Sequence, residues 1–184
     1  MFNTIDRFGL VAIILHWVIA LTIFGLFGVG WYMIDLSYYD KLKYTLPAIH
    51  KSIGMLLILV FGFWVIWKLI NLTPEPVEGS TRFEIIASKL AHLGLAGLIA
   101  IILLTGYLIP TAKGMGISVF GWFEVPATIT SIPQQEDITG QIHKYLAYTV
   151  IGLALLHAGA ALKHHFINKD DTLRRMLGRV SRNK

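Results

Sequence analysis

The sequence of 184 residues contains seven histidines and no cysteine, which limits the kinds of metal and redox site that it can form. Without cysteine, disulfides, thiolate zinc sites, iron–sulfur clusters and covalently attached haem are excluded. His143 and His157 lie fourteen positions apart in one apolar run. On a helix they would be about 21 Å apart along the axis and within roughly 40° of the same face. A histidine inside a membrane helix is costly and by default a functional candidate, although helix–helix hydrogen bonds could also satisfy both side chains.

The composition predicts an integral membrane protein, because 55% of the residues are hydrophobic and only 15% are charged. Four runs free of charge can each cross a hydrocarbon core of about 30 Å. They lie between Arg7 and Asp35, Lys51 and Lys68, Lys89 and Lys113, and Lys144 and Lys163. We predict an all-α four-helix bundle, a single membrane domain over 1–184, with transmembrane helices near 8–34, 47–70, 85–110 and 139–166.

Eleven of the 16 lysines and arginines lie near the N-terminus, in the connector around 71–88 and in the tail, 167–184, counted together with the adjoining helix ends. The positive-inside rule therefore predicts that both termini are cytoplasmic. The basic tail is expected to lie on the anionic inner leaflet as an amphipathic segment, and the net charge of +5 suits this surface better than nucleic acid. The connector 111–138 is long and apolar for a loop in water, which favours a packed cap or ligand lid over a loosely ordered loop.

Matching the histidines by depth in this topology pairs His16 with His157 in the inner half and His50 with His143 in the outer half. Each pair comes from two helices and could clamp a flat ring from both faces. Non-covalent haem b needs two axial imidazole nitrogens and an apolar slot. The four side chains are therefore predicted to bind haem iron, at an inner and an outer haem. Two histidine ligands leave no open coordination position, which favours electron transfer over oxygen binding.

Other polar side chains lie where haem propionates or a quinone would need them. Lys51 and Lys144 each follow a predicted outer ligand, and Arg7 could serve the inner haem, although snorkelling at helix ends would explain these cations equally well. His92 could contact a ligand, bind quinone, replace an inner ligand, or be an interfacial histidine. His164 shares the face of His157 and is a candidate propionate or quinone contact, with a position at headgroup level as the alternative.

Several segments resemble the bacterial cytochrome b561 family over essentially the whole chain: His16-Trp17, HKSIG at 50–54, AHLGL at 91–95, HKYLAYTVIGLALLHAGAALKHHF at 143–166 and KDDTLRRML at 169–177. The outer connector, GYLIPTAKGMGISVFGWFEVPAT, is more similar to a less characterised enterobacterial branch than to the best-studied member. The resemblance implies a four-helix bundle in the bacterial inner membrane with two haems b, held by His16, His50, His143 and His157. The best-studied member of this family is regarded as a superoxide:ubiquinone oxidoreductase, and the enterobacterial branch is associated with a small periplasmic isoprenoid-binding protein. The resemblance therefore implies this activity or this partner for the chain.

The expected function is electron transfer by a di-haem b-type cytochrome, an oxidoreductase that exchanges electrons with ubiquinone or another quinone, with periplasmic superoxide as a candidate donor. Two alternatives stay open. The chain could be a membrane anchor that serves a separate dehydrogenase or periplasmic partner, or a haem-free, histidine-lined carrier of metal ions or protons. No nucleic acid is expected as a partner.

Overall fold

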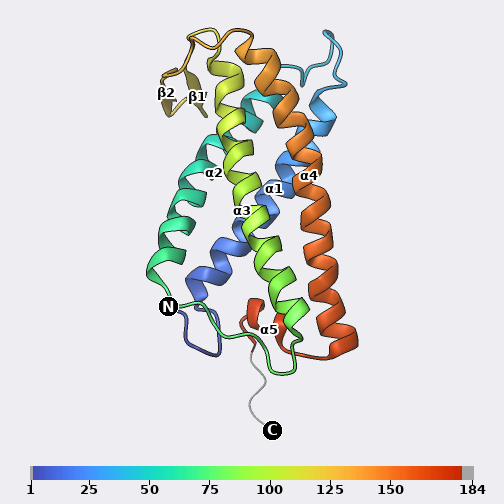
Figure 1. The fold of residues 1–184 in the computed structure, drawn as a ribbon. Helices are drawn as coiled ribbons and strands as arrows, with labels where there is room; N and C mark the ends of the chain where they lie inside the picture. The colour runs from blue at the N-terminus through green and yellow to red at the C-terminus, as the bar shows by residue number, and fades with distance from the viewer. Residues whose placement is uncertain (1, 180–184) are drawn as a thin grey trace. The chain divides into compact units, whose positions relative to one another are not determined.

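The computed structural model describes residues 2–179 and is built mainly from helices (Figure 1). Within these residues, four helices are long and apolar enough to cross a membrane. They are α1 at Leu10–Met33, α2 at Thr45–Ile70, α3 at Arg82–Thr111 and α4 at Gln135–Lys163. The predicted all-α four-helix membrane bundle is confirmed.

The helix ends follow local chemistry rather than the limits of the apolar runs. α3 begins after a capping box, in which the Glu84 amide donates to Thr81 Oγ1 at 3.2 Å and the Thr81 amide donates to Glu84 Oε2 at 2.9 Å. α4 begins at Gln135 rather than near 139, because Glu136 and Asp137 suit the positive end of the helix dipole. Beyond α4 the chain forms a π-helical turn, η1, at His164–Asn168, and then the short helix α5 at Thr172–Met176.

The chain divides into two compact units, and each long helix contributes to both. Among the described residues, the first unit contains the chain up to Ile19, Val60–Ala96 and everything from Gly152 onward. The second unit contains Ala20–Leu59 and Gly97–Ile151. His16, His92, His157 and His164 belong to the first unit, and His50 and His143 belong to the second.

In the second unit the connector 111–138 forms a β-hairpin, which the sequence did not predict. Strands β1, Ile117–Val119, and β2, Phe123–Val125, pair antiparallel. Ile117 and Val119 are buried against Met55 of α2. The buried Ser52 hydroxyl accepts from the Phe120 amide at 3.1 Å and donates to the Ser118 carbonyl at 3.4 Å. The connector is therefore packed rather than loose.

The hairpin contacts α2 on a face away from His50. Ser52 and Met55 follow His50 by two and five positions, which places them about 200° and about 140° around the helix from it. Tyr107 of α3 holds the following segment, since its hydroxyl donates to the Pro126 carbonyl at 2.8 Å. The predicted cap over the outer histidine pair accordingly stays a prediction.

In the first unit the tail folds back onto the other segments. Trp17 Nε1 of α1 donates to the Met176 carbonyl at 2.8 Å, and Arg175 Nη1 donates to the Glu75 carbonyl at 2.7 Å. α5 is therefore docked on protein groups, and the predicted contact of this amphipathic segment with the inner leaflet stays a prediction. The last part of the predicted basic tail, 180–184, lies outside the described residues.

Candidate functional site

The first unit brings together His16 of α1 and His157 of α4, here called the first pair. Their ring centroids are 6.2 Å apart and their planes are inclined by 61°. The two histidines lie on different helices, so the packing of α1 against α4 brings their rings together. The sequence-based pairing of these two histidines agrees with this geometry.

The second unit brings together His50 of α2 and His143 of α4, here called the second pair. Their ring centroids are 6.3 Å apart and their planes are inclined by 72°. The two pairs therefore have nearly the same separation, although they use different partner helices for α4.

This separation suits a metal centre between two imidazoles. An iron ion bound from opposite sides needs ring centroids roughly 6 Å apart, which is the sum of two metal–nitrogen bonds of about 2 Å and half of each ring. Both pairs meet this requirement, and neither pair is close enough for a direct hydrogen bond between its rings. The residues present fit haem iron in both units.

His92 of α3 does not meet the same requirement. Its ring centroid is 4.8 Å from that of His157, which is too short for an iron ion between them. Its Nδ1 lies 2.7 Å from the Ser88 carbonyl of the preceding turn, so His92 is held by its own helix. The geometry favours His16 over His92 as the axial partner of His157.

His143 has a well-defined set of contacts on α3. Its Nδ1 lies 3.0 Å from the Ile102 carbonyl and 3.1 Å from Thr105 Oγ1. A carbonyl can only accept, so this geometry assigns the proton to Nδ1 and leaves the lone pair on Nε2. Metal-binding histidines commonly use the second nitrogen in this way. His50 differs, because its buried Nδ1 faces the Leu26 carbonyl of α1 without a well-formed hydrogen bond and has no hydroxyl partner.

Two glycines of the second unit lie directly against these rings. A Cβ at Gly106 would lie 3.1 Å from His143 Cε1, and a Cβ at Gly30 would lie 3.3 Å from His50 Cε1. Any larger residue would push on the imidazole. Sequence reasoning missed Gly30, Gly106 and Thr105, because their value depends on which helix faces which histidine.

Comparison with known proteins identifies the family to which this chain belongs. The model of the prokaryotic cytochrome b561 family matches residues 7–179. The protein named cytochrome b561 homolog 2 of Escherichia coli (strain K12) is 44% identical over 179 residues, which cover 97% of this chain and 95% of that relative. The chain belongs to the prokaryotic cytochrome b561 family.

Two further relatives are more distant. Cytochrome b561 homolog 1 of Escherichia coli (strain K12) is 29% identical over 178 residues, covering 95% of this chain and 98% of the relative. A Yersinia pestis protein named probable superoxide oxidase CybB is 26% identical over 176 residues, covering 93% and 96%. The predicted family is confirmed, and the higher identity to homolog 2 agrees with the predicted closeness to a less characterised enterobacterial branch.

Membership of the cytochrome b561 family makes this chain a membrane haem b electron-transfer protein. With its four apolar helices, it is a multi-pass protein of the bacterial inner membrane. Within the described part of the chain, no group of three or more His, Asp or Glu side chains is arranged to hold a metal ion.

The other residues predicted to contact haem propionates or quinone lie in two kinds of environment. Arg7, Lys51 and Lys144 are exposed, and among the residues that the structure describes none of them forms an ion pair. His164 lies between two carboxylates, with Nδ1 2.5 Å from Asp170 Oδ2 and Nε2 3.9 Å from Glu84 Oε1. Contacts of these four residues with propionates or quinone stay predictions.

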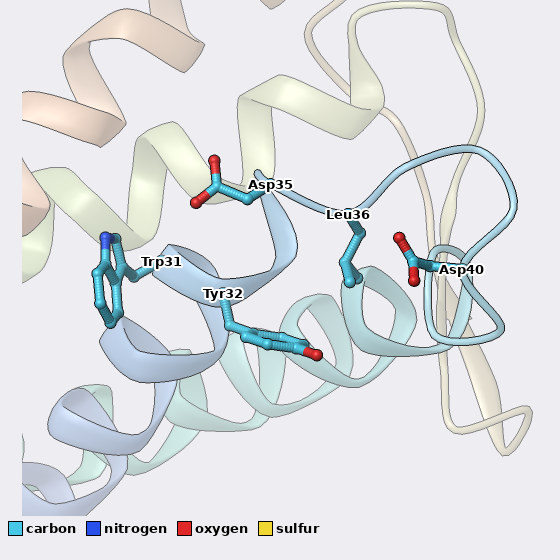
Figure 2. A pocket seen from close by; sticks show the side chains of 5 residues that line it. All are labelled: Trp31, Tyr32, Asp35, Leu36 and Asp40. Atoms are coloured by element: carbon cyan, nitrogen blue, oxygen red, sulfur yellow. The ribbon is translucent and has the colours of Figure 1, made fainter.

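A cavity of about 320 Å³ lies at the end of α1 in the second unit. Figure 2 shows its lining side chains, Trp31, Tyr32, Asp35, Leu36 and Asp40. No histidine lines this cavity, and Trp31 and Tyr32 project from α1 in different directions. It is separate from the histidine pairs and is not part of the candidate haem site.

Proposed function

We propose that this cytochrome b561 binds two haems b, one between His16 and His157 and the other between His50 and His143. The observation that carries the proposal is the presence of two histidine pairs with ring separations of 6.2 and 6.3 Å, each contributed by two helices. Haem b with two imidazole ligands supplies reversible one-electron chemistry between ferric and ferrous iron. The exposed cations Arg7, Lys51 and Lys144 would bind its propionates.

We further propose that the protein, as one membrane domain with both termini in the cytoplasm, exchanges electrons with ubiquinone or another quinone. The bias of lysine and arginine toward the N-terminus, the 71–88 connector and the tail supports this orientation. His92 and His164 are candidate hydrogen-bonding partners of the quinone. Superoxide is the proposed periplasmic donor, and the distant relative with a superoxide oxidase name supports it.

A second function is favoured by the exposed tip of the hairpin. Phe120 and Trp122 are 43% and 74% exposed, and Phe120 has a positive φ of 50°. The positive φ is the one that this tight hairpin turn requires, and the turn holds both aromatic side chains at the tip. This surface suits a docking partner, so the protein could serve as the membrane electron-transfer subunit of a periplasmic protein, the small isoprenoid-binding protein being one candidate.

The first experiment measures haem in the purified protein as the pyridine haemochrome. We expect two haems b per chain in the wild type and one in each of the variants His16→Ala, His50→Ala, His143→Ala and His157→Ala. The matched control is His165→Ala, which lies outside both pairs and should keep both haems. A colourless wild type would instead support the haem-free carrier, and a variant that keeps two haems would remove that histidine from the ligand set.

The second experiment separates the two functions with the haem-loaded protein. Superoxide generated in solution should reduce ubiquinone faster in the presence of the protein than in its absence. If quinone reduction is not accelerated, and a partner protein co-purifies after mild detergent extraction, the subunit function replaces the oxidoreductase function.

A further inference from the structure

Two oxygen atoms of α3 hold the imidazole of His143 in place. Its Nδ1–H points to the Ile102 carbonyl at 3.0 Å and to Thr105 Oγ1 at 3.1 Å. The Thr105 hydroxyl donates its own proton to the same Ile102 carbonyl at 3.0 Å. The lone pairs of Thr105 Oγ1 are therefore left to face the imidazole, so both oxygens act as acceptors for one N–H group.

The backbone at Gly106 completes this arrangement. A Cβ at this position would lie 3.1 Å from Cε1 of His143, which is closer than ordinary packing, and 3.5 Å from Nδ1. Thr105 is itself only 5% exposed, so its side chain has little free space in which to move. The Thr105 hydroxyl therefore fixes the direction of the N–H group, and the backbone at Gly106, which has no side chain, fixes the position of the ring edge.

His50, the other member of the second pair, has a simpler set of contacts. Its buried Nδ1 faces the Leu26 carbonyl of α1 without a well-formed hydrogen bond, and no hydroxyl bonds to it. The Thr105 hydroxyl therefore distinguishes the two imidazoles, and electron donation to an iron ion between them would be adjusted from the His143 side.

We propose that Thr105 and Gly106 are positioning residues that set the redox potential of the haem held by the second pair. The inference rests on the proposed haem ligation. A hydrogen bond from the outer N–H of a ligating imidazole raises its basicity, and a more basic ligand favours ferric over ferrous iron. Gly106 keeps the imidazole at the angle at which both acceptors are reached.

The test is a potentiometric titration of purified, haem-loaded protein. Thr105→Val removes the hydroxyl and keeps nearly the same shape. We expect the potential of one haem to rise, so that its ratio of oxidised to reduced form at the wild-type midpoint falls at least threefold, while the other haem is unchanged. Thr105→Ser restores a hydroxyl and should return the potential toward the wild type.

The matched control is Thr139→Val. Thr139 is also buried in the second unit, at 7% exposure, and its hydroxyl donates to the Gln135 carbonyl at 2.6 Å rather than to a histidine. We expect both potentials to stay at their wild-type values. An equal shift in this control would show that loss of any buried hydroxyl moves the potential and would overturn the assignment to Thr105.

Gly106→Ala provides a second readout, the low-spin ferric spectrum in electron paramagnetic resonance, which reports how the ligand planes are oriented. One of the two signals should shift. If this variant does not fold, the Thr105 pair of variants decides. Two haems with unmoved potentials and spectra in Thr105→Val would overturn the inference and leave the haem proposal intact, whereas two haems retained in His143→Ala would contradict the haem proposal itself.

Discussion

The two histidine pairs have almost the same geometry in different surroundings. Ring separations are 6.2 Å in the first pair and 6.3 Å in the second. In the first unit a third imidazole, that of His92, lies against His157, whereas in the second unit a carbonyl and a hydroxyl face His143. Both sets of neighbours come from α3, which contributes no member of either pair. The comparison indicates that α1, α2 and α4 set the distance between the paired histidines, whereas α3 supplies the groups that contact His143 and His157.

The largest effect is expected when one pair is removed completely. The double variant His16→Ala/His157→Ala should keep one haem with the spectrum and potential of the second site, and His50→Ala/His143→Ala should keep one with those of the first. Spectroelectrochemistry of the two purified variants checks this. Two identical residual spectra would contradict the difference in surroundings, and complete loss of haem from both would show that the sites do not fold separately.

His92 provides a smaller change within the first unit. His92→Leu should retain two haems, because the 4.8 Å separation from His157 leaves no room for iron between them. It should alter only the spectrum of the first site, since the contact to His157 is lost. The measurement is haem content together with low-temperature absorption spectra. Loss of one haem would make His92 a ligand and His16 a neighbour.

Much of this fold follows from the sequence because membrane crossing needs a simple signal, an apolar run of sufficient length. The same topology brought His50 to the depth of His143, and His16 to that of His157. Thr105, Gly106 and Gly30 could not be found in this way, because they act across helix interfaces and a single sequence does not say which faces meet. The hairpin was also hidden, since β1 and β2 contain three residues each and their pairing depends on burial against Met55.

Loss of the hairpin anchor should have a moderate effect that is limited to stability. Ser52→Ala leaves the partly buried Phe120 amide without its acceptor, which should cost about 1 kcal/mol. Ser88→Ala in the first unit is the matched change, and because Ser88 is exposed its effect should stay within about 0.5 kcal/mol. Thermal unfolding in detergent, followed by circular dichroism, compares the two variants. Equal destabilisation would show that the hairpin is not held through Ser52.

The smallest predicted effect is on acid stability of the first unit. Burial by itself would raise the pKa of Asp170, but hydrogen bonds from His164 and Thr172 outweigh it and hold the pKa below its ordinary value of 3.8. A carboxylate with a lowered pKa stabilises the fold above its ordinary pKa, and this contribution is lost as pH falls through the lowered value.

Asp170→Asn should therefore destabilise the protein at pH 7 and differ less from the wild type in acid below pH 3.8. Thermal midpoints at both pH values measure the difference. Asp6→Asn, an exposed acid in the same unit, is the control and should lower neither midpoint. A gap between wild type and Asp170→Asn that widens in acid would reverse the sign and refute the argument.

In the π-helical turn at His164–Asn168, the exact number of residues determines where the following segment lies. A π turn accommodates one residue more than an α turn, and each residue added or removed shifts the following chain by about 1.5 Å and about 100°. Deletion of a single residue here should restore regular α-helix and rotate Asp170 away from His164. The attachment of α5 to Trp17 would then be out of register, so a one-residue gap among relatives in this turn would mark a change in tail architecture.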